Sequence, residues 1–264
     1  MKRIALEVNH LSYTFPDGTL ALRDISFSVK EGEKLMIIGP NGAGKSTLLL
    51  NFNGLLRGKG EVKIYGEAIT KKNLKKIRSQ VGLVFQNPED QLFMPKVVDD
   101  VAFGLFGRGV NREEIESKVK KILGDLGLES LAEKSPHQLS LGEKKKVSLA
   151  TVLVLKPEIL ILDEPSSGLD PGSRRWLINY LQKTDRTTVV ATHDLDLAWE
   201  LGQTMILMDK GKIVARGGKE EILGNKNLLE QHGLEVPLLY LLERFSPGSG
   251  GKGSDYVFSG SGKN

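Results

Sequence analysis

The sequence has no cysteine, little net charge and no uninterrupted apolar run long enough to cross a bilayer. Without cysteine the chain can build neither a disulfide framework nor a cysteine-ligated zinc site, which fits a reducing compartment. The most apolar stretch, residues 147–162, is broken by Lys156-Pro157-Glu158, so we expect no membrane-spanning helix. Met1-Lys2-Arg3 leads straight into an alternating strand pattern, so we expect no signal peptide. These absences predict a soluble chain that reaches a membrane only through a partner.

The charge balance argues against a nucleic-acid partner. The chain of 264 residues carries 37 Lys and Arg against 33 Asp and Glu, a net charge of +4, whereas nucleic-acid binders usually present a clustered basic face. The basic cluster at residues 71–78 is typical of a solvated helix face. With 39% hydrophobic residues, the chain can form one sizeable core, or one core and a small appended domain.

A phosphate-binding loop is the strongest motif. Residues 39–46, Gly-Pro-Asn-Gly-Ala-Gly-Lys-Ser, fit the pattern G-x-x-x-x-G-K-[ST], with an apolar strand pattern before them and a helical pattern after them. The glycines let backbone N–H groups point at one spot, where the helix N-terminus adds partial positive charge. We expect Lys45 to reach the outer phosphates and Ser46 to hold Mg²⁺.

A pair of carboxylates follows a second buried strand. Residues 159–162 are apolar, and Asp163 and Glu164 come at their C-terminal end, where open α/β sheets bind ligands. Asp163 is suited to hold a Mg²⁺-bound water and Glu164 to orient or deprotonate an attacking water; two solvated turn residues are the alternative. His193 ends a further strand pattern, residues 188–192, on the same expected side of the sheet, with a packed or surface histidine as the alternative.

The remaining patterns predict an α/β protein in which the middle of the chain is helical. Strand patterns occur at residues 4–8, 25–29, 60–66 and 81–85, and a hairpin pattern at 205–215; the first two strands are expected in an antiparallel layer. Between them, Tyr13 or Phe15 can stack on an adenine ring, or both can be core aromatics. Residues 112–123 have helical spacing, and Gly127 is expected to end that helix in the left-handed conformation.

Two further features lie at a helix start and at the end of the chain. Ser140 precedes Glu143 by three positions before a long helical pattern, which predicts a capping box and equally an anion site at a helix N-terminus. Helical patterns follow at residues 219–223 and 237–245. Residues 246–264 are dominated by Gly and Ser, and we expect this tail to be disordered.

In their order along the chain, the motifs resemble those of the ATP-binding cassette (ABC) ATPases. They are residues 39–46, Gln86, the Leu-Ser-x-Gly-Glu signature at 139–143, residues 162–164 and His193. The signature distinguishes this family from other P-loop NTPases, which lack it. The resemblance implies a P-loop NTPase (RecA-like) core with an antiparallel β subdomain in an ATPase domain at 1–220. It also implies a helical signature subdomain at about 91–155. A short C-terminal dimerisation module is expected at 221–245.

The resemblance also implies ATP and Mg²⁺ as cofactors, clasped in a head-to-tail dimer between the phosphate loop of one subunit and the signature of the other. By position, Glu164 is the catalytic base and His193 contacts the γ-phosphate. Gln86 and Ser46 bind Mg²⁺, helped by Asp163 through water. The implied nucleotide-binding residues, with Phe15 favoured over Tyr13 for the adenine, are Phe15, Asn41, Gly42, Ala43, Gly44, Lys45, Ser46, Thr47, Ser140, Gly142 and Asp170. Leu141 and Glu143 depart from the usual Gly and Gln of the signature.

A narrower resemblance is to the ATPases of energy-coupling factor (ECF) importers of cobalt, nickel or vitamins. It rests on residues 85–93, Phe-Gln-Asn-Pro-Glu-Asp-Gln-Leu-Phe, and on residues 98–104 and 233–237. It implies a peripheral place at the cytoplasmic face of the membrane, with a membrane coupling subunit docked near Gln86–Phe93 and a separate substrate-binding membrane subunit. The cassette pairs with itself or with a sister ATPase.

Three alternatives stay open at this stage: another type of ABC transporter, an ABC ATPase acting on nucleic acid or ribosomes, and a nucleotide-binding scaffold without turnover. The short spacing between Lys45 and Ser140 and the lack of heptad runs disfavour the second. Glu164 disfavours the third, because a scaffold needs no catalytic base.

Overall fold

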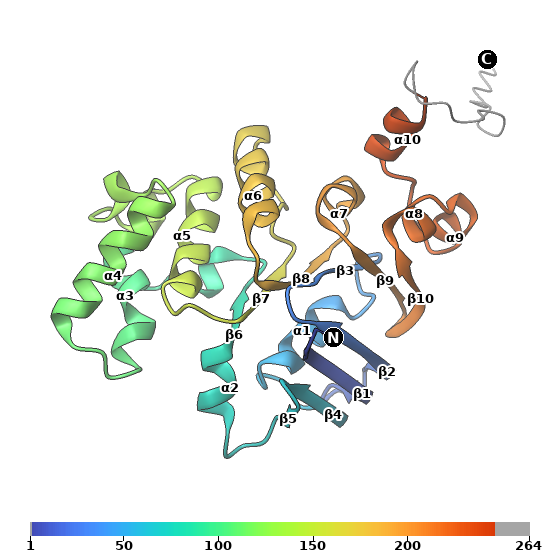
Figure 1. The fold of residues 1–264 in the computed structure, drawn as a ribbon, viewed down its shortest axis with the longest axis horizontal. Helices are drawn as coiled ribbons and strands as arrows, with labels where there is room; N and C mark the ends of the chain where they lie inside the picture. The colour runs from blue at the N-terminus through green and yellow to red at the C-terminus, as the bar shows by residue number, and fades with distance from the viewer. Residues whose placement is uncertain (1, 246–264) are drawn as a thin grey trace.

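The computed structural model describes residues 2–245, which form two β-sheets flanked by helices (Figure 1). The larger sheet has the strand order β10-β9-β3-β8-β7-β6. Its parallel strands are β3 (Lys34–Ile38), β6 (Val81–Val84), β7 (Ile159–Asp163), β8 (Thr187–Thr192) and β9 (Thr204–Asp209), and β10 (Lys212–Gly218) pairs antiparallel with β9. The sequences of the central strands are continuous apolar runs, because helices or the second sheet cover both faces of these strands.

The smaller sheet is the predicted antiparallel layer, with the order β2-β1-β4-β5. Its strands are β1 (Ile4–Thr14), β2 (Leu20–Lys30), β4 (Lys59–Ile64) and β5 (Glu67–Ala68). β1 and β2 run well beyond residues 4–8 and 25–29, because shifts of register let pairing continue where the alternation breaks. The strand expected over 60–66 ends earlier: Tyr65 and Gly66 have φ of 49° and 83° and turn the chain into β5.

The larger sheet separates two hydrophobic cores. α1 (Lys45–Phe52) contacts strands of both sheets, and it shares one core with Leu35 and Ile37 of β3. Met36 and Ile38, the alternate residues of the same strand, belong to the core on the opposite face. This two-residue alternation shows that both faces of β3 are buried, and the phosphate loop follows directly from its end.

The remaining helices stand in groups around the larger sheet. They are α2 (Leu74–Gln80), α3 (Val97–Phe106), α4 (Arg112–Asp125), α5 (Leu141–Leu153), α6 (Pro171–Lys183), α7 (Leu195–Leu201), α8 (Lys219–Leu223), α9 (Lys226–Gln231) and α10 (Leu238–Phe245). In Figure 1, α3–α5 form one end of the molecule and α8–α10 the other. Gly127, with φ of 67°, follows α4 as predicted.

Within residues 2–245, every helix is too short or too polar to traverse a bilayer. The disorder expected for residues 246–264 concerns a segment outside the described residues.

Candidate active site

The phosphate loop joins β3 to α1, in the strand–loop–helix context that the sequence predicted. Close backbone contacts require glycine at two of its positions. A Cβ on Gly39 would lie 2.2 Å from the carbonyl oxygen of Met208, and a Cβ on Gly44 2.7 Å from that of Ala21. Both glycines also have positive φ, 152° and 98°. The N-terminus of α1 opens at this loop, where its N–H groups and dipole favour an anion.

Lys45 and Glu164 form a buried ion pair beside the loop. Lys45 Nζ lies 3.4 Å from Glu164 Oε1, and the two side chains are 6% and 5% exposed. The amine also donates to the carbonyl oxygens of Gly39 (2.8 Å) and Pro40 (3.1 Å). The acceptors given for this amine belong to the loop and to the residue that follows β7, so a phosphate entering the loop can replace them with charge-assisted hydrogen bonds.

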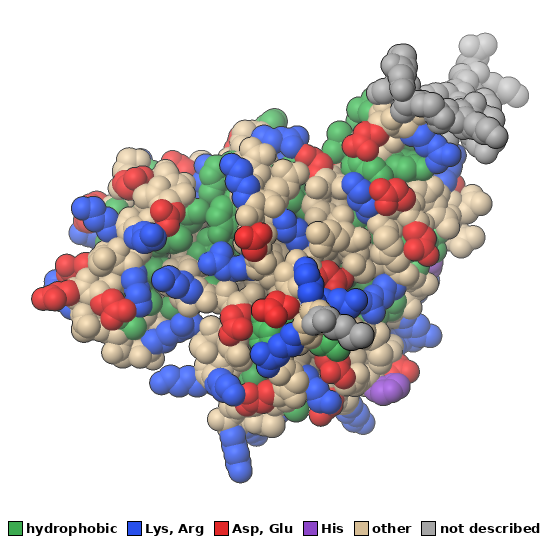
Figure 2. Space-filling model, viewed as in Figure 1, with side chains coloured by type: hydrophobic (Ala, Val, Ile, Leu, Met, Phe, Trp, Pro, Cys, Tyr) green, Lys and Arg blue, Asp and Glu red, His purple; other side chains and the backbone are tan. Residues whose placement is uncertain are grey.

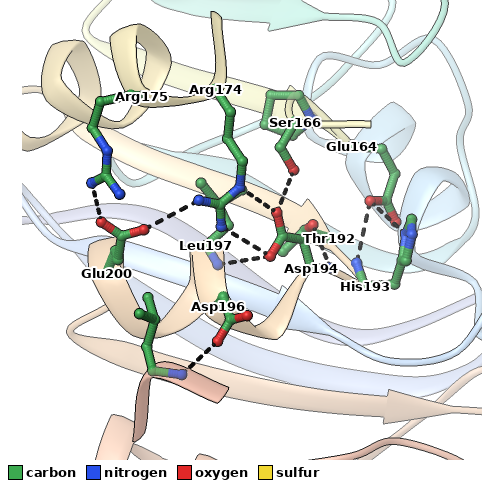
Figure 3. A network of polar contacts seen from close by, with 12 residues as sticks. Glu164, Ser166, Arg174, Arg175, Thr192, His193, Asp194, Asp196, Leu197 and Glu200 are labelled. Carbon is green, nitrogen blue, oxygen red and sulfur yellow. Dashed lines mark hydrogen bonds and ion pairs between the residues drawn. The ribbon is translucent and has the colours of Figure 1, made fainter. Parts of the chain in front are cut away.

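Glu164 is held in a strained position at the end of β7. Its φ is 43°, in the left-handed region that a non-glycine residue rarely occupies. Its backbone N–H donates to the carbonyl oxygen of Ala191 at 2.8 Å. Its Oε2 accepts from the backbone N–H of His193 at 3.2 Å and lies 2.9 Å from His193 Nδ1 (Figure 3). Because the imidazole is 49% exposed and the carboxylate 5%, the histidine forms the outer side of this pair.

Asp163 carries a buried carboxylate oxygen, Oδ1, without a hydrogen-bond partner in the described part of the chain. Burial raises the pKa of this carboxyl, and a hydrogen bond from Ser46 opposes that rise. An unsatisfied carboxylate oxygen next to a loop hydroxyl suits a hard cation that prefers oxygen ligands, either directly or through water. The residues present therefore fit a Mg²⁺ ion.

A pocket of about 540 Å³ opens over the loop and gathers most of the predicted site. The predicted residues on its walls are Phe15, Asn41, Gly42, Ala43, Gly44, Lys45, Ser46, Thr47, Gln86 and Glu164. Phe15 lines the pocket, and Tyr13 packs edge-on against it with ring centroids 5.0 Å apart. The stacking role expected for Phe15 stays a prediction.

Arg23 and Lys210 also line this pocket, and the sequence analysis did not predict them. The backbone N–H of Arg23 donates to the carbonyl oxygen of Gly211 at 2.8 Å, which brings β2 against the turn between β9 and β10. The sequence signal there was the hairpin pattern at 205–215, whose turn falls at Lys210-Gly211. Arg23, Lys45 and Lys210 outnumber the single acid on the walls, Glu164, so the pocket suits a polyanion.

Ser140, Gly142 and Asp170 form a second group that does not line this pocket. Ser140 caps α5 through the predicted capping box: Glu143 N–H donates to Ser140 Oγ (3.3 Å), and Ser140 N–H donates to Glu143 Oε2 (2.8 Å). Asp170 caps α6 and accepts from the N–H of Ser173 at 3.0 Å. A Cβ on Gly142 would lie 2.3 Å from Ser173 Oγ, so the two helix N-termini touch.

A polar network fixes the segment that carries His193 (Figure 3). Asp194 caps α7 by accepting from the N–H of Leu197 at 2.8 Å. Its carboxylate also accepts from Arg174 Nε (3.1 Å) and Nη2 (3.2 Å) and from Ser166 Oγ (3.0 Å). The network joins the loop after β7, α6 and α7. This network could not be predicted from the sequence, because no local pattern pairs these residues.

The parallel sheet, the loop after β3 and the acids after β7 define a P-loop nucleotide hydrolase. Residues 22–167 match the ABC transporter family. A putative ABC transporter ATP-binding protein of Gloeobacter violaceus is 50% identical over 236 residues, covering 88% of this chain and 97% of that protein. The energy-coupling factor transporter ATP-binding protein EcfA of Carboxydothermus hydrogenoformans is 44% identical over 243 residues, covering 90% of each.

Solved structures agree with these matches. The structure of cbiO1 from Clostridium perfringens, described as part of the ABC transporter complex cbiONQ, has a TM-score of 0.76 and 36% identity, covering 92% of this chain and 100% of that one. The ATP-binding cassette MJ0796, a dimer bound to ADP and Pi, has a TM-score of 0.74 and 29% identity, covering 81% and 98%. The chain belongs to the ABC transporter family. It is an ATP-binding, ATP-hydrolysing subunit with the fold that the sequence predicted.

Proposed function

We propose that this chain is the ATPase subunit of an ECF-type importer and works as a head-to-tail dimer. The proposal of a dimer rests on one observation. The helix N-terminus at Ser140 is exposed and lies outside the pocket that contains the phosphate loop. The phosphate loop and the helix N-terminus at Ser140 both favour binding of phosphate groups. A single triphosphate can contact the two of them if the Ser140 helix comes from another subunit. That subunit is a second copy of this chain or a sister ATPase. The similar cassette MJ0796 is dimeric, which supports the arrangement.

The proposed reaction is attack of water on the γ-phosphorus of ATP, with cleavage of the bond to the ADP oxygen. Glu164 accepts a proton from the water, Lys45 and the loop amides bind the β- and γ-phosphates, and His193, oriented by its contact with Glu164, contacts the γ-phosphate. Ser140 and Gly142 of the other subunit grip the same phosphate. Catalysis is then mostly positioning and charge stabilisation.

The proposed Mg²⁺ ligands are Ser46 and Gln86, with Asp163 acting through water. When bound, this ion neutralises charge on the β- and γ-phosphate oxygens. The unsatisfied oxygen of Asp163 supports its place in the site.

We propose that the segment Gln86–Phe93 and the adjoining face of α3 dock the membrane coupling subunit. Phe93 and Phe103 contact edge to face with ring centroids 4.9 Å apart, and they are 62% and 52% exposed. Phe106, about one helical turn further along α3, is 59% exposed. A contiguous exposed aromatic surface of this kind favours a protein partner. Gln91 Nε2 joins the segment to α5 by donating to the carbonyl oxygen of Ser148 at 2.7 Å.

The ECF type is favoured by the similar proteins named EcfA and by the likeness to cbiO1. In this proposal a separate substrate-binding membrane subunit selects a metal ion, cobalt or nickel, or a vitamin, and the chain sits peripherally at the cytoplasmic face. Another type of ABC transporter is the second candidate, because other similar proteins carry only the broader name.

The proposed domain division keeps residues 1–220 as the ATPase domain, with a helical signature subdomain at about 91–155, and residues 221–245 as a dimerisation module. α10 packs on α7 through Tyr240, whose ring lies 5.1 Å from that of Trp199. Leu238 is 60% exposed on the same helix, and Figure 2 shows hydrophobic side chains gathered over α10. This surface supports a contact with a second subunit.

The substitution Glu164→Gln tests the assignment of the base. We expect it to preserve MgATP binding, to lower kcat by about 10²- to 10⁴-fold and to trap an ATP-bound dimer. Steady-state hydrolysis and size-exclusion chromatography with and without MgATP measure these effects. Glu158→Gln, at an exposed acid before the other end of β7, is the matched control. Hydrolysis by Glu164→Gln at the parental rate would refute the assignment.

A further inference from the structure

Lys145 reaches from the signature helix to the backbone of the proposed base. It lies on α5, just over one turn after Ser140, and its Nζ donates to the carbonyl oxygens of Glu164 at 2.9 Å and Pro165 at 3.2 Å. Its side chain is half-buried in an apolar crevice between α5 and α6, and hydrophobic atoms are visible there in Figure 2. Leu149 and Leu162 are among the residues that line the crevice.

The contact is made where the backbone is strained. Glu164 has a φ of 43°, and its carbonyl oxygen accepts a second hydrogen bond, from the N–H of Ser167 at 3.2 Å. Lys45 and His193 hold only the carboxylate end of Glu164. The ammonium of Lys145 holds the opposite end, the peptide plane that sets the direction of the Cα–Cβ bond.

The ammonium is kept in this crevice in spite of its desolvation. Burial lowers the pKa of Lys145 to about 8, and the nearby carboxylates of Glu164 and Asp163 act in the opposite direction. Its two carbonyl acceptors compensate part of the lost hydration. Neighbouring lysines of α5 have other partners: Lys144 pairs with Glu89 at 3.0 Å, and Lys146 Nζ lies 4.7 Å from the centre of the Trp176 ring.

We propose that Lys145 is a positioning residue for ATP hydrolysis: it pins the strained Glu164 peptide to the signature helix, so that the base is aligned only when α5 is in place. The inference rests on the proposed role of Glu164. In a head-to-tail dimer, Ser140 serves the nucleotide of the other subunit. Lys145 therefore links the base of one site mechanically to the phosphate grip of the other.

Lys145→Met removes the ammonium and both of its hydrogen bonds but fits the apolar crevice. We expect its Kd for MgATP to stay within about twofold of the parental value and its melting temperature to stay unchanged. We expect kcat to fall about ten- to a hundredfold, as for a misplaced catalytic group. Lys145→Arg, which keeps a charged donor, should recover most of kcat. Lys121→Met, at an exposed lysine of α4, is the matched control and should behave like the parental protein.

A double variant separates positioning from general weakening. In the background of Glu164→Gln, adding Lys145→Met should leave the residual hydrolysis rate unchanged, because Lys145 acts through the base. A further fall in that background, or a parental kcat in Lys145→Met alone, overturns the inference. If Glu164→Gln itself hydrolyses ATP at the parental rate, the proposed base has failed. If it is inactive while Lys145→Met is fully active, only the role of Lys145 has failed.

Discussion

Single side chains mark two parts of the pocket over the phosphate loop. Lys45 lies at the loop, buried and bonded to the loop carbonyls, and Phe15 lines the same pocket from the turn between β1 and β2. A lysine that was not held by such hydrogen bonds would lose more conformational entropy when it bound a phosphate. The phenylalanine offers only a face, which every base can stack on.

Phe15 is expected to contribute to affinity through its ring face alone. Phe15→Ala should weaken MgATP binding by about 5- to 150-fold, since stacking of one base on an aromatic ring contributes about 1–3 kcal/mol. GTP affinity should fall by a similar factor, because stacking does not read the edge of the base. Calorimetric titration measures both affinities. Phe106→Ala, an exposed phenylalanine on α3, is the control, and equal Kd values for Phe15→Ala and the parental protein would contradict the stacking role.

At the scale of elements, the contact between α6 and α7 depends on charge. Arg174 on α6 bonds Asp194, the cap of α7, and also donates to Glu200 at 3.3 Å. Burial alone raises the pKa of Asp194. The hydrogen bonds and charge of Arg174, with the Leu197 N–H and the Ser166 hydroxyl, outweigh burial and leave the pKa lowered. The folded state therefore favours the ionised carboxylate.

The stability that the Asp194 carboxylate contributes depends on pH. A carboxyl whose folded pKa is lowered contributes stability that is fully present above its unfolded pKa, about 4, and is lost as pH falls through the folded value. Arg174→Met should lower the free energy of unfolding by about 2 kcal/mol at pH 7. The difference from the parental protein should shrink as the pH is lowered below about 4. Urea unfolding at several pH values measures this, and a difference that does not vary with pH would contradict it.

Elements defined by local patterns could be predicted, and those defined by distant partners could not. The strand before the loop, the capping box at Ser140 and the turn at Lys210-Gly211 depend on a few consecutive residues, and the structure confirms all three. The turn at Tyr65 was missed because tyrosine rarely adopts positive φ. The contact of Lys145 with Glu164 spans 19 positions and leaves no local signal.

The candidate site follows the same division. The site residues that could be predicted belong to motifs of a few consecutive residues, the phosphate loop above all. Arg23 reaches the pocket only because β2 lies against the turn between β9 and β10, which depends on the packing of the two sheets. The roles assigned to the site residues stay predictions.

At the scale of the whole molecule, the aromatic face of α3 and the nucleotide pocket are separate surfaces. Phe103→Asp should leave ATP hydrolysis by the isolated protein unchanged, since the residue lies outside the pocket. It should reduce the amount of the chain recovered with its membrane partner after detergent extraction, because a buried charge would oppose docking. Leu55→Asp, at another exposed apolar residue, is the control. Equal recovery of the two variants would contradict the proposed docking face.

The departure at Leu141 places a leucine beside Gly168. Gly168 has a φ of 72°, and a Cβ there would lie 2.7 Å from Leu141 Cδ2. That atom is the far end of a flexible side chain that is 41% exposed, so the leucine can move aside. The left-handed backbone at residue 168 remains, and it strains any residue that has a Cβ. Glycine at 168 is thus required by the local chain conformation, and a smaller residue at 141 would not relax that requirement.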